Sequence, residues 1–490
     1  KKRGANYFGL SPFKNEKTPS FSVHPGKGIF KCFATGIGGD VFSFLKQMEG
    51  IEFYEAIRLL ADRYNVSLPE EEPGAQEKAN EKDSLYAALR WAGRYFYRTL
   101  TGSPRGARGL DYLEGRGFTP ETIKKFGLGY ATEAWDDLLV AAENEHVSAD
   151  TLEKAGLVIP RKDGSGHYDR YRGRVIFPIF SHIGKTIGFG GRILDAQSDQ
   201  PKYINSPETP VYQKSRVLYG LHQGRQDIRR QEEALLVEGY TDVISLHQAG
   251  VENAVATCGT ALTPEQVRLL SRYARRIVLL YDADGAGLNA AARGIDTVLE
   301  HWRMDETDVQ KALAEGFAVY AVMLPEGDDP DTYVRRHGAD AFREYVRKHR
   351  QDFVAFRYEL AKRAGELNTP EGTVAAQQAA LTSIAYLPNP LLREQYLRRA
   401  AEVFGVPDIH LHEAWLEQGR SRYGGDIGLR SRAGGQRVPR GVGHRRLPEL
   451  RRGRRRHRSR HRRVGHRRAG RRAPRMGSHR LRPARGRDRR

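Results

Sequence analysis

The sequence predicts an α/β protein with a Rossmann-like parallel β-sheet as its core, set within an α+β, multidomain chain. Two short apolar runs, residues 234–237 and 277–280, are each followed by a helical pattern, at 241–249 and 286–302. Short β-rich runs that alternate with helices are typical of buried parallel strands. A further apolar run at 317–324 predicts another strand. We expect a small β-rich domain and an α+β subdomain before this core, and a helical subdomain after it.

Acidic residues follow each of the three runs, in clusters that comprise Glu238 and Asp242, then Asp282 and Asp284, then Asp328, Asp329 and Asp331. In an open α/β sheet, ligands bind outside the carboxyl ends of the strands. Oxygen ligands suit a hard cation such as Mg²⁺, which carboxylates hold together with phosphate oxygens. A single acid at such a place would be interpreted as a helix cap. Three clusters at successive strand ends instead favour a metal site for nucleotidyl transfer.

These residues carry a resemblance to a known family. Glu238 with Asp242, Asp282-x-Asp284 and Asp329-x-Asp331 resemble the Toprim signature, which primases, topoisomerases and some nucleases share. The sequences Glu-Gly-Tyr-Thr-Asp-Val and Tyr-Asp-Ala-Asp-Gly-Ala-Gly are similar to motifs of bacterial DnaG-type primases. The resemblance covers roughly residues 4–415. It implies a nucleotidyltransferase, a DNA-dependent RNA polymerase that makes short RNA primers on single-stranded DNA for replication.

The resemblance also implies roles for the acids. Glu238, Asp282 and Asp284 are the expected catalytic residues and metal ligands, and Asp329 and Asp331 are expected to complete the metal site. The expected cofactor is Mg²⁺, with Mn²⁺ as the alternative. Carboxylates placed this densely repel one another, so the cluster should be unfavourable until cations bind.

A basic segment precedes the predicted sheet. Arg170, Arg172 and Arg174 alternate along a predicted strand and would share one face, with Tyr171 and Tyr203 interleaved. Charge that tracks phosphate and aromatic rings that stack on bases suit a single-strand groove, whereas a solvated strand face is the alternative. The segment, and Lys-Tyr-Ile-Asn-Ser-Pro-Glu-Thr-Pro after it, resemble primase motifs beside the active site. The residues implied to bind DNA are Arg170, Arg172, Arg174, Arg192 and Asn205, and those implied to bind the nucleoside triphosphate are Lys202, Lys214 and Tyr240.

The first 68 residues resemble the zinc-ribbon domain of bacterial primases. Where that family has Cys and His ligands, this chain has Ser11, Lys14, Cys32 and Thr35. Tetrahedral zinc needs several thiolate or imidazole ligands, and Cys32 is the only family ligand left. We therefore predict that the domain keeps its fold and binds no zinc.

Composition and motifs divide the chain into segments. We predict a zinc-ribbon-like DNA-binding domain at 1–68, a linker at 69–84, the N-terminal subdomain of an RNA polymerase core with a basic ridge at 85–230, a Toprim catalytic subdomain at 231–330, a helical subdomain at 331–418 and a disordered Arg-rich tail at 419–490. The linker is acidic, polar and contains Pro and Gly. The family ends in a helical domain that docks on the replicative helicase, and no such pattern is visible here.

The formal net charge of +21 belongs to the tail. Residues 430–490 contain 26 Arg, no Lys and two acids, a charge of +24, which leaves −3 for the rest of the chain. Such a segment cannot bury enough apolar surface to fold alone. An Arg-rich nucleic-acid-binding tail is one interpretation, and a reading frame shifted out of register is the one we favour.

Other features limit the class of protein. With only two Cys, the sequence does not predict a disulfide framework and favours a reducing cytoplasm. No apolar run is long enough to span a membrane. The chain starts at Lys1 within a pattern, so we expect residues before it. The expected partners are a single-stranded DNA template, ribonucleoside triphosphates and the replicative helicase, with a monomeric chain. The alternatives are a Toprim nuclease, a topoisomerase-like enzyme and a non-catalytic single-stranded DNA-binding protein.

Overall fold

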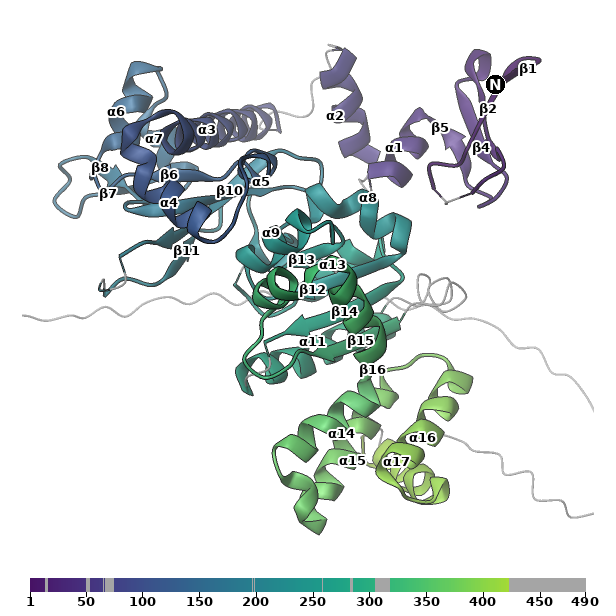
Figure 1. The fold of residues 1–490 in the computed structure, drawn as a ribbon. Helices are drawn as coiled ribbons and strands as arrows, with labels where there is room; N and C mark the ends of the chain where they lie inside the picture. Colours follow the sequence, from purple (N-terminus) through teal and green to yellow (C-terminus); the bar gives the residue numbers. More distant parts are fainter. Residues whose placement is uncertain are drawn as a thin grey trace, which may run out of the picture. The chain divides into compact units, whose positions relative to one another are not determined.

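A five-stranded, mostly parallel β-sheet forms the centre of the chain (Figure 1). The structure is a computed structural model, and it describes residues 1–13, 16–49, 53–64, 66, 75–195, 197, 199–257, 259–282, 285–304 and 318–422. The strands of the sheet are β12 (Glu233–Val237), β13 (Ala254–Ala256), β14 (Arg276–Tyr281), β15 (Ala318–Met323) and β16 (Gln351–Asp352). Their spatial order is β13-β12-β14-β15-β16, with only β16 antiparallel to its neighbour. The three strands predicted from apolar runs are therefore confirmed.

Both faces of this sheet are covered, which explains the continuous apolar runs. Successive residues of β14 point to opposite sides, so Ile277 and Leu279 enter one core cluster while Val278 and Leu280 enter the other, and all four are fully buried. The helices of this region are α8 (Leu221–Gln231), α9 (Tyr240–Gln248), α10 (Pro264–Ser271), α11 (Gly285–Met304) and α13 (Pro330–His349). Residues of α10 and α11 line the first cluster, and residues of α9 and α13 line the second.

A mixed region precedes the sheet. It comprises α3 (Ala75–Gly102), η2 (Pro104–Gly106), α4 (Ala107–Gly115), α5 (Pro120–Phe126), β6 (Gly129–Ala131), α6 (Asp137–Asn144), α7 (Ala149–Lys154), β7 (Val158–Pro160), β8 (His167–Asp169), β9 (Arg174–Phe180), β10 (Thr186–Ile193), β11 (Tyr203–Asn205) and η3 (Lys214–Arg216). An antiparallel sheet has the order β11-β10-β9-β6, and β7 pairs with β8. The predicted linker at 69–84 is shorter than expected because α3 begins at Ala75; residues 67–74 lie outside the described residues.

The N-terminal unit is a small antiparallel sheet followed by two helices. Its elements are β1 (Lys2–Arg3), β2 (Asn6–Gly9), β3 (Phe21–His24), η1 (Pro25–Lys27), β4 (Ile29–Cys32), β5 (Gly38–Asp40), α1 (Val41–Glu49) and α2 (Phe53–Tyr64). The strands pair in chain order. The rings of Phe13, Phe21, Phe30 and Phe44 lie 5.4–5.9 Å apart and form the centre of the unit.

Four helices and one 3₁₀ turn close the described chain: α14 (Phe353–Arg363), η4 (Glu366–Asn368), α15 (Pro370–Ala385), α16 (Pro390–Phe404) and α17 (Asp408–Arg422). Their apolar residues continue the first core cluster of the central sheet. The helical subdomain is predicted to begin at residue 331, but in the structure it begins at α14. The reason is that β16 is a strand of the central sheet and α13 packs against that sheet. The tail from 423 lies outside the described residues.

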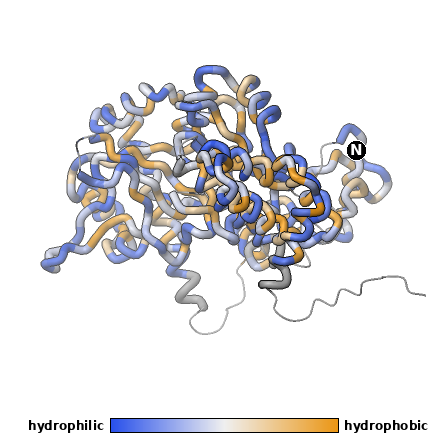
Figure 2. The backbone as a smooth tube through the Cα atoms, turned by 90° about the horizontal axis from the view of Figure 1, so that it is seen from below, coloured by the Kyte–Doolittle hydropathy of each residue, from blue (hydrophilic) through white to orange (hydrophobic). Residues whose placement is uncertain are grey.

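Apolar and polar stretches alternate along the backbone through these regions, as Figure 2 shows. None of the helices in the described part of the chain is long and apolar enough to cross a bilayer.

Candidate active site

The acidic clusters lie at the carboxyl ends of three adjacent strands. Glu238 directly follows β12 and Asp282 directly follows β14, while Asp328 and Asp329 lie between β15 and α13. Because β12, β14 and β15 are parallel neighbours, the sheet brings the three clusters to one edge, as the sequence predicts. Asp284, the second acid of its motif, lies outside the described residues.

Glu238 and Asp282 are held against each other. The backbone amide of Asp282 donates a hydrogen bond to Oε1 of Glu238 over 3.0 Å. Gly287, near the start of α11, makes this approach possible. A Cβ at this position would lie 2.4 Å from the carbonyl oxygen of Asp282 and 2.7 Å from Oε1 of Glu238. Only glycine fits there without moving one of the two acids.

Asp242 lies in the middle of the acidic groups. Its Oδ2 accepts a hydrogen bond from the amide of Gly239 over 2.9 Å, so it caps α9. Burial, together with the nearby carboxylates of Asp329, Asp282 and Asp331, raises the pKa of Asp242 to about 7, against the lowering effect of the Gly239 amide. Carboxylates that disfavour one another's ionisation create a place where a cation would be stabilised.

Asp329 caps the following helix. Its Oδ1 accepts from the amide of Thr332 over 2.6 Å, and its own amide donates to Oγ1 of Thr332 over 2.9 Å. The neighbouring Asp328 forms an ion pair with Arg336 at 2.8 Å. The simpler interpretation of these acids as helix caps is therefore correct for Asp242 and Asp329. A cap uses only part of a carboxylate, so it leaves acceptor capacity for a cation.

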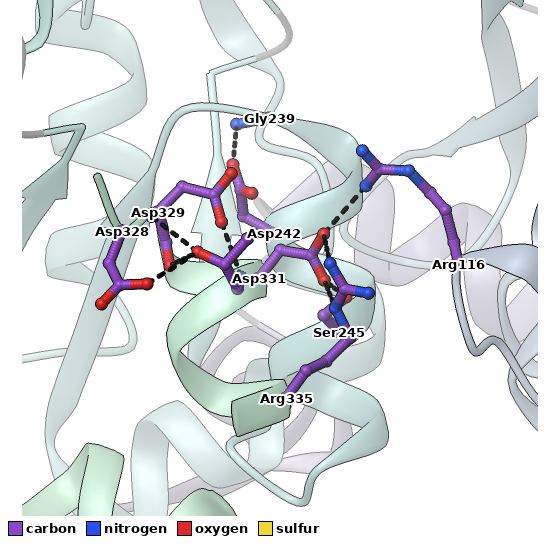
Figure 3. Close-up of polar contacts among 9 residues, drawn as sticks. Arg116, Gly239, Asp242, Ser245, Asp328, Asp329, Asp331 and Arg335 are labelled. Atoms are coloured by element: carbon purple, nitrogen blue, oxygen red, sulfur yellow. Dashed lines mark hydrogen bonds and ion pairs between the residues drawn. The ribbon is translucent and has the colours of Figure 1, made fainter. Parts of the chain in front are cut away.

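Asp331 differs from the other acids because basic side chains surround it. It is 2% exposed. Nη1 of Arg116 lies 2.9 Å from Oδ2, Nε of Arg335 lies 2.7 Å from Oδ1, and the hydroxyl of Ser245 donates to Oδ1 over 2.5 Å (Figure 3). Asp331 is a predicted metal ligand, but its contacts in the structure are those of a buried ion pair.

The donor chemistry of this edge fits Mg²⁺. Glu238, Asp282 and Asp329 offer oxygen only, which is the ligand type that this ion prefers. In the described residues, no three or more His, Cys, Asp or Glu side chains are arranged as a ready metal-binding group. Mg²⁺ commonly keeps several waters and binds through one or two carboxylates and the phosphates of a substrate, so a complete protein cage is not required.

The prediction that Arg174 lies on a basic strand face that binds DNA is wrong. Its guanidinium donates to the carbonyl oxygens of Gly191 and Pro201 and to Oε1 of Gln200, at 3.0–3.1 Å, and the residue is 1% exposed. A side chain enclosed in this way holds β9, β10 and the following loop together and has no surface for a template. The reason is that three carbonyl-type acceptors inside the fold require a donor.

Arg170 and Arg172 also depart from the predicted strand. They lie between β8 and β9, not on a strand. The guanidinium of Arg172 stacks 4.2 Å from the ring of Trp135 and 5.2 Å from that of Tyr168. Tyr171 is buried, and its hydroxyl donates to the carbonyl oxygen of Phe189 over 2.9 Å, so it cannot stack on a base.

Arg192 fits the predicted surface role better. It is half-buried on β10, and its guanidinium lies 4.6 Å from the ring of Tyr112 and 5.8 Å from that of Tyr203. Within the described structure, its Nε and Nη1 atoms have no hydrogen-bond partner. A buried cationic donor that lacks an acceptor is costly, so an arriving phosphate would be stabilised here.

The candidate nucleotide-binding residues are only partly brought together. The hydroxyl of Tyr240 donates to Oδ1 of Asn205 over 2.8 Å, which joins α9 to β11, but the Tyr240 ring is buried against Phe177 at 5.1 Å. Lys202 is exposed beside β11, and Lys214 begins η3. Among the described residues, no hydrogen bond or ion pair joins these two Lys to each other or to the acidic clusters, and their role stays a prediction.

Sequence analysis missed the residues around Asp331. Arg335 carries a detectable signal, since it stands four residues after Asp331 on the same helix. Ser245 has only a helical spacing from Asp242. Arg116 has no local signal at all, because 215 residues separate it from Asp331.

Family models match most of the described chain. They are the CHC2 zinc finger at residues 1–76, the N-terminal domain of the DNA primase catalytic core at 95–225, the Toprim-like domain at 235–334 and the DnaB-helicase binding domain of primase at 354–408.

Curated relatives agree with these matches. A DNA primase from Geobacillus stearothermophilus is 40% identical over 429 residues, which cover 86% of this chain and 68% of the relative. The chain belongs to the DnaG-type DNA primase family. A DNA primase from Halalkalibacterium halodurans is 39% identical over 406 residues, 83% of this chain and 65% of the relative. The chain thus spans about two thirds of the length of these primases.

Solved primase structures share the fold. A DNA primase domain from Pseudomonas aeruginosa matches with a TM-score of 0.59 and 36% identity, covering 67% of this chain and 98% of that one. A DnaG primase catalytic domain bound to ssDNA matches with a TM-score of 0.58 and 33% identity, covering 68% and 99%. The Aquifex aeolicus primase, with its zinc binding and RNA polymerase domains, matches with a TM-score of 0.57 and 30% identity, covering 84% and 93%.

The zinc finger match corrects the prediction that zinc is not bound. That prediction considered only thiolate and imidazole ligands at four family positions. The carboxylate of Glu16 accepts a hydrogen bond from the hydroxyl of Ser20 over 2.6 Å and another from the amide of Ser11 over 2.8 Å. The hydroxyls of Ser20 and Ser11 lie 3.8 Å and 3.2 Å from the Cys32 thiol. Carboxylates are zinc ligands as well as thiolates. The described residues of this unit do not themselves form a complete ligand set, and Lys14 lies outside them.

The helicase match corrects a second prediction. Sequence patterns show no docking region, but the model of the DnaB-helicase binding domain matches residues 354–408, which include α15, α16, most of α14 and the start of α17. The sequence predicts these helices only as part of a helical subdomain. They do pack on the central sheet, through Phe356 and Ile384 among others, so one segment has both features.

Proposed function

We propose that this chain is a DNA primase, a DNA-dependent RNA polymerase that synthesises short RNA primers on single-stranded DNA. The observation that carries the proposal is the meeting of Glu238, Asp282 and Asp329 at the carboxyl ends of three adjacent parallel strands, in a chain of the primase family. Substrates and partners are proposed with it, since the chain spans about two thirds of its relatives.

In the proposed reaction, Glu238, Asp282 and Asp329 would hold Mg²⁺, with Asp284 as the remaining motif acid. Bound there, the ion would lower the pKa of the attacking 3′-hydroxyl and neutralise charge on the pyrophosphate leaving group. Gly287 keeps Glu238 and Asp282 in register by allowing their close approach. Mn²⁺ is the alternative ion, because it takes the same oxygen ligands.

The remaining groups would bind the substrates. Lys202 and Lys214 are proposed for the triphosphate, and the Tyr240–Asn205 pair is proposed to fix the nucleotide beside β11. Arg192 is proposed to bind a template phosphate, because its donors lack protein acceptors in the described structure. Arg170 and Arg172 are proposed only to contact the template outside the active site. Arg174 is left out because it is enclosed.

The proposed partners are single-stranded DNA and the replicative helicase. A related catalytic domain is described as bound to ssDNA, and residues 354–408 match the helicase-binding model. Ribonucleoside triphosphates as substrates, a monomeric state and a cytoplasmic location remain proposals of the same kind.

Two isosteric variants test the function. With a single-stranded template, labelled ribonucleotides and Mg²⁺, Glu238→Gln and Asp282→Asn should each reduce primer synthesis at least about 100-fold, since metal ligation contributes several kcal/mol to such reactions. Glu265→Gln, an exposed acid on α10, is the charge-matched control and should be unaffected. Near-normal synthesis by Glu238→Gln and Asp282→Asn would refute the site, and cleaved DNA as the product would favour a Toprim nuclease.

A further inference from the structure

Both oxygens of the Asp331 carboxylate are occupied by protein partners, through three hydrogen bonds and one further ion-pair contact. An ionised carboxylate offers about four lone-pair positions. Oδ1 receives the hydroxyl of Ser245 at 2.5 Å and Nε of Arg335 at 2.7 Å. Oδ2 receives Nη1 of Arg116 at 2.9 Å and Nη2 of Arg335 at 3.1 Å. Arg335 therefore donates one hydrogen bond to Oδ2 and holds its Nε in ion-pair contact with Oδ1, so each oxygen of Asp331 has two polar partners.

Ligation of a cation by Asp331 would require breaking some of these bonds. The carboxylate is 2% exposed, and Arg116 and Arg335 are 29% and 42% exposed, so the pair is partly removed from water. Removing one partner from a buried ion pair leaves an uncompensated charge and is strongly unfavourable. Two guanidinium groups beside one carboxylate also give this position a net positive charge, which opposes a second cation.

The loop that carries Arg116 is clamped separately. It connects α4 to α5, and Gln248 at the end of α9 binds it twice. Oε1 of Gln248 accepts from the amide of Thr119 over 2.9 Å, and its Nε2 donates to the carbonyl oxygen of Gly117 over 2.8 Å. One side chain thus satisfies both a backbone donor and a backbone acceptor. The loop is fixed on α9 by Gln248 and on α13 by Asp331.

The Arg116 loop is also connected through packed side chains to Arg192, the residue proposed to bind a template phosphate. The guanidinium of Arg116 lies 5.9 Å from the ring of Tyr112, and that of Arg192 lies 4.6 Å from the same ring. A continuous series of contacts therefore runs from Asp331 through Arg116 and Tyr112 to Arg192. A change at Asp331 would be transmitted along packed groups to the residue proposed to hold template phosphate.

We propose that Asp331 is a positioning residue that docks the Arg116 loop beside the acidic cluster, and that it does not ligate the catalytic cation. This inference rests on the proposed primase function and refines it: Glu238, Asp282 and Asp329 serve the cation, whereas Asp331, Arg116 and Gln248 align the template side of the site with it. Gln248 acts only through the loop.

Cation binding and synthesis separate the two roles. Mn²⁺ affinity, measured by electron paramagnetic resonance on the full chain, should fall at least tenfold in Asp282→Asn and change less than twofold in Asp331→Asn and Arg116→Gln. The latter two should each lower kcat at least tenfold without changing the Mg²⁺ concentration for half-maximal rate. Their double variant should lose less than the two single variants combined, because both remove the Arg116–Asp331 pair.

Gln248→Ala provides a variant outside the buried pair. It should lower kcat at least threefold and raise the KM for template, with unchanged Mn²⁺ affinity, while Gln378→Ala on the exposed face of α15 should change nothing. Loss of Mn²⁺ affinity in Asp331→Asn as large as that in Asp282→Asn would overturn the proposal, and so would unchanged kcat in Gln248→Ala. A wild-type chain that makes no primers would instead refute the proposed function, and the Mn²⁺ comparison would still decide the role of Asp331.

Discussion

At the scale of single residues, two arginines on neighbouring strands have opposite environments. Arg174 on β9 is enclosed and donates to Gly191, Pro201 and Gln200, and burial lowers its pKa from the usual value. Arg192 on β10 stacks on Tyr112 and keeps two donors without acceptors in the described structure. The first is a structural group, and the second is available to a ligand.

Replacing each by methionine should separate stability from binding. Arg174→Met leaves several buried acceptors without a donor, so the free energy of unfolding should fall by about 2–4 kcal/mol. Arg192→Met keeps the packing against Tyr112 and should change it by less than about 1 kcal/mol, but should weaken single-stranded DNA binding. Urea titrations and a fluorescence binding assay check the pair. Equal loss of stability in both variants would contradict the assignment.

Sequence reasoning failed at Arg174 for a physical reason. Alternating charges indicate which residues share a face, but they do not reveal which face contains buried carbonyl acceptors. Asp331 shows a related gap, since its partner Arg116 is 215 residues away and leaves no local pattern. Glu238 and Asp282 could be placed correctly because both positions follow from short apolar runs and from the rule that parallel strands end at one edge.

At the scale of elements, α11 is fitted to the acids by one glycine. Gly287→Ala would put a Cβ 2.4 Å from the carbonyl oxygen of Asp282 and 2.7 Å from Glu238, whereas the same change at Gly294 meets only the flexible end of Leu279 at 3.2 Å. Alanine favours a helix in both places.

We therefore expect Gly287→Ala to reduce primer synthesis at least about tenfold and Gly294→Ala to leave it nearly unchanged. Circular dichroism should show full helicity in both variants. Normal activity in Gly287→Ala would mean that Glu238 and Asp282 tolerate separation.

The helix α9 contains a buried histidine that couples stability to pH. Nε2 of His247 donates to the carbonyl oxygen of Ala254 over 2.9 Å, and the ring packs against Phe126. Burial lowers the pKa of His247 to about 4. Because the folded pKa lies below the unfolded value of about 6.5, the contribution to stability is present above pH 6.5 and is lost as pH falls towards 4.

This residue should account for about 3 kcal/mol of acid destabilisation across that interval. His247→Gln keeps a donor for Ala254 and has no titrating group, so its unfolding free energy should depend less on pH between 6.5 and 4. Chemical denaturation at several pH values measures this slope. An unchanged slope would show that other groups dominate acid unfolding.

At the scale of the whole molecule, charge is distributed unevenly along the chain. Residues 430–490 hold 26 Arg and two acids, and the remaining sequence has a charge near −3. Binding that depends on released counterions scales with the number of phosphate contacts. The tail should therefore dominate sequence-independent DNA binding at low salt, whereas the acids that are proposed for catalysis all lie before residue 332.

A chain that ends at Arg422, the last residue of α17, should retain primer synthesis and bind single-stranded DNA with a much weaker dependence on salt. The slope of log affinity against log salt concentration, compared with that of the full chain, measures the effect. Loss of synthesis at saturating template would make the tail part of the enzyme.

The smallest strand of the central sheet has a mechanical consequence for the entire chain. The backbone of Asp352 in β16 pairs with Tyr320 of β15, its carboxylate caps α14 by accepting from the amides of Val354 and Ala355, and its Oδ2 receives Nε of Arg399 from α16 at 3.1 Å. A load that a partner applies to α14 or α16 therefore passes through this joint into β15. The far end of that strand leads to the loop that carries Asp328 and Asp329, so a single strand connects this joint to the acidic edge.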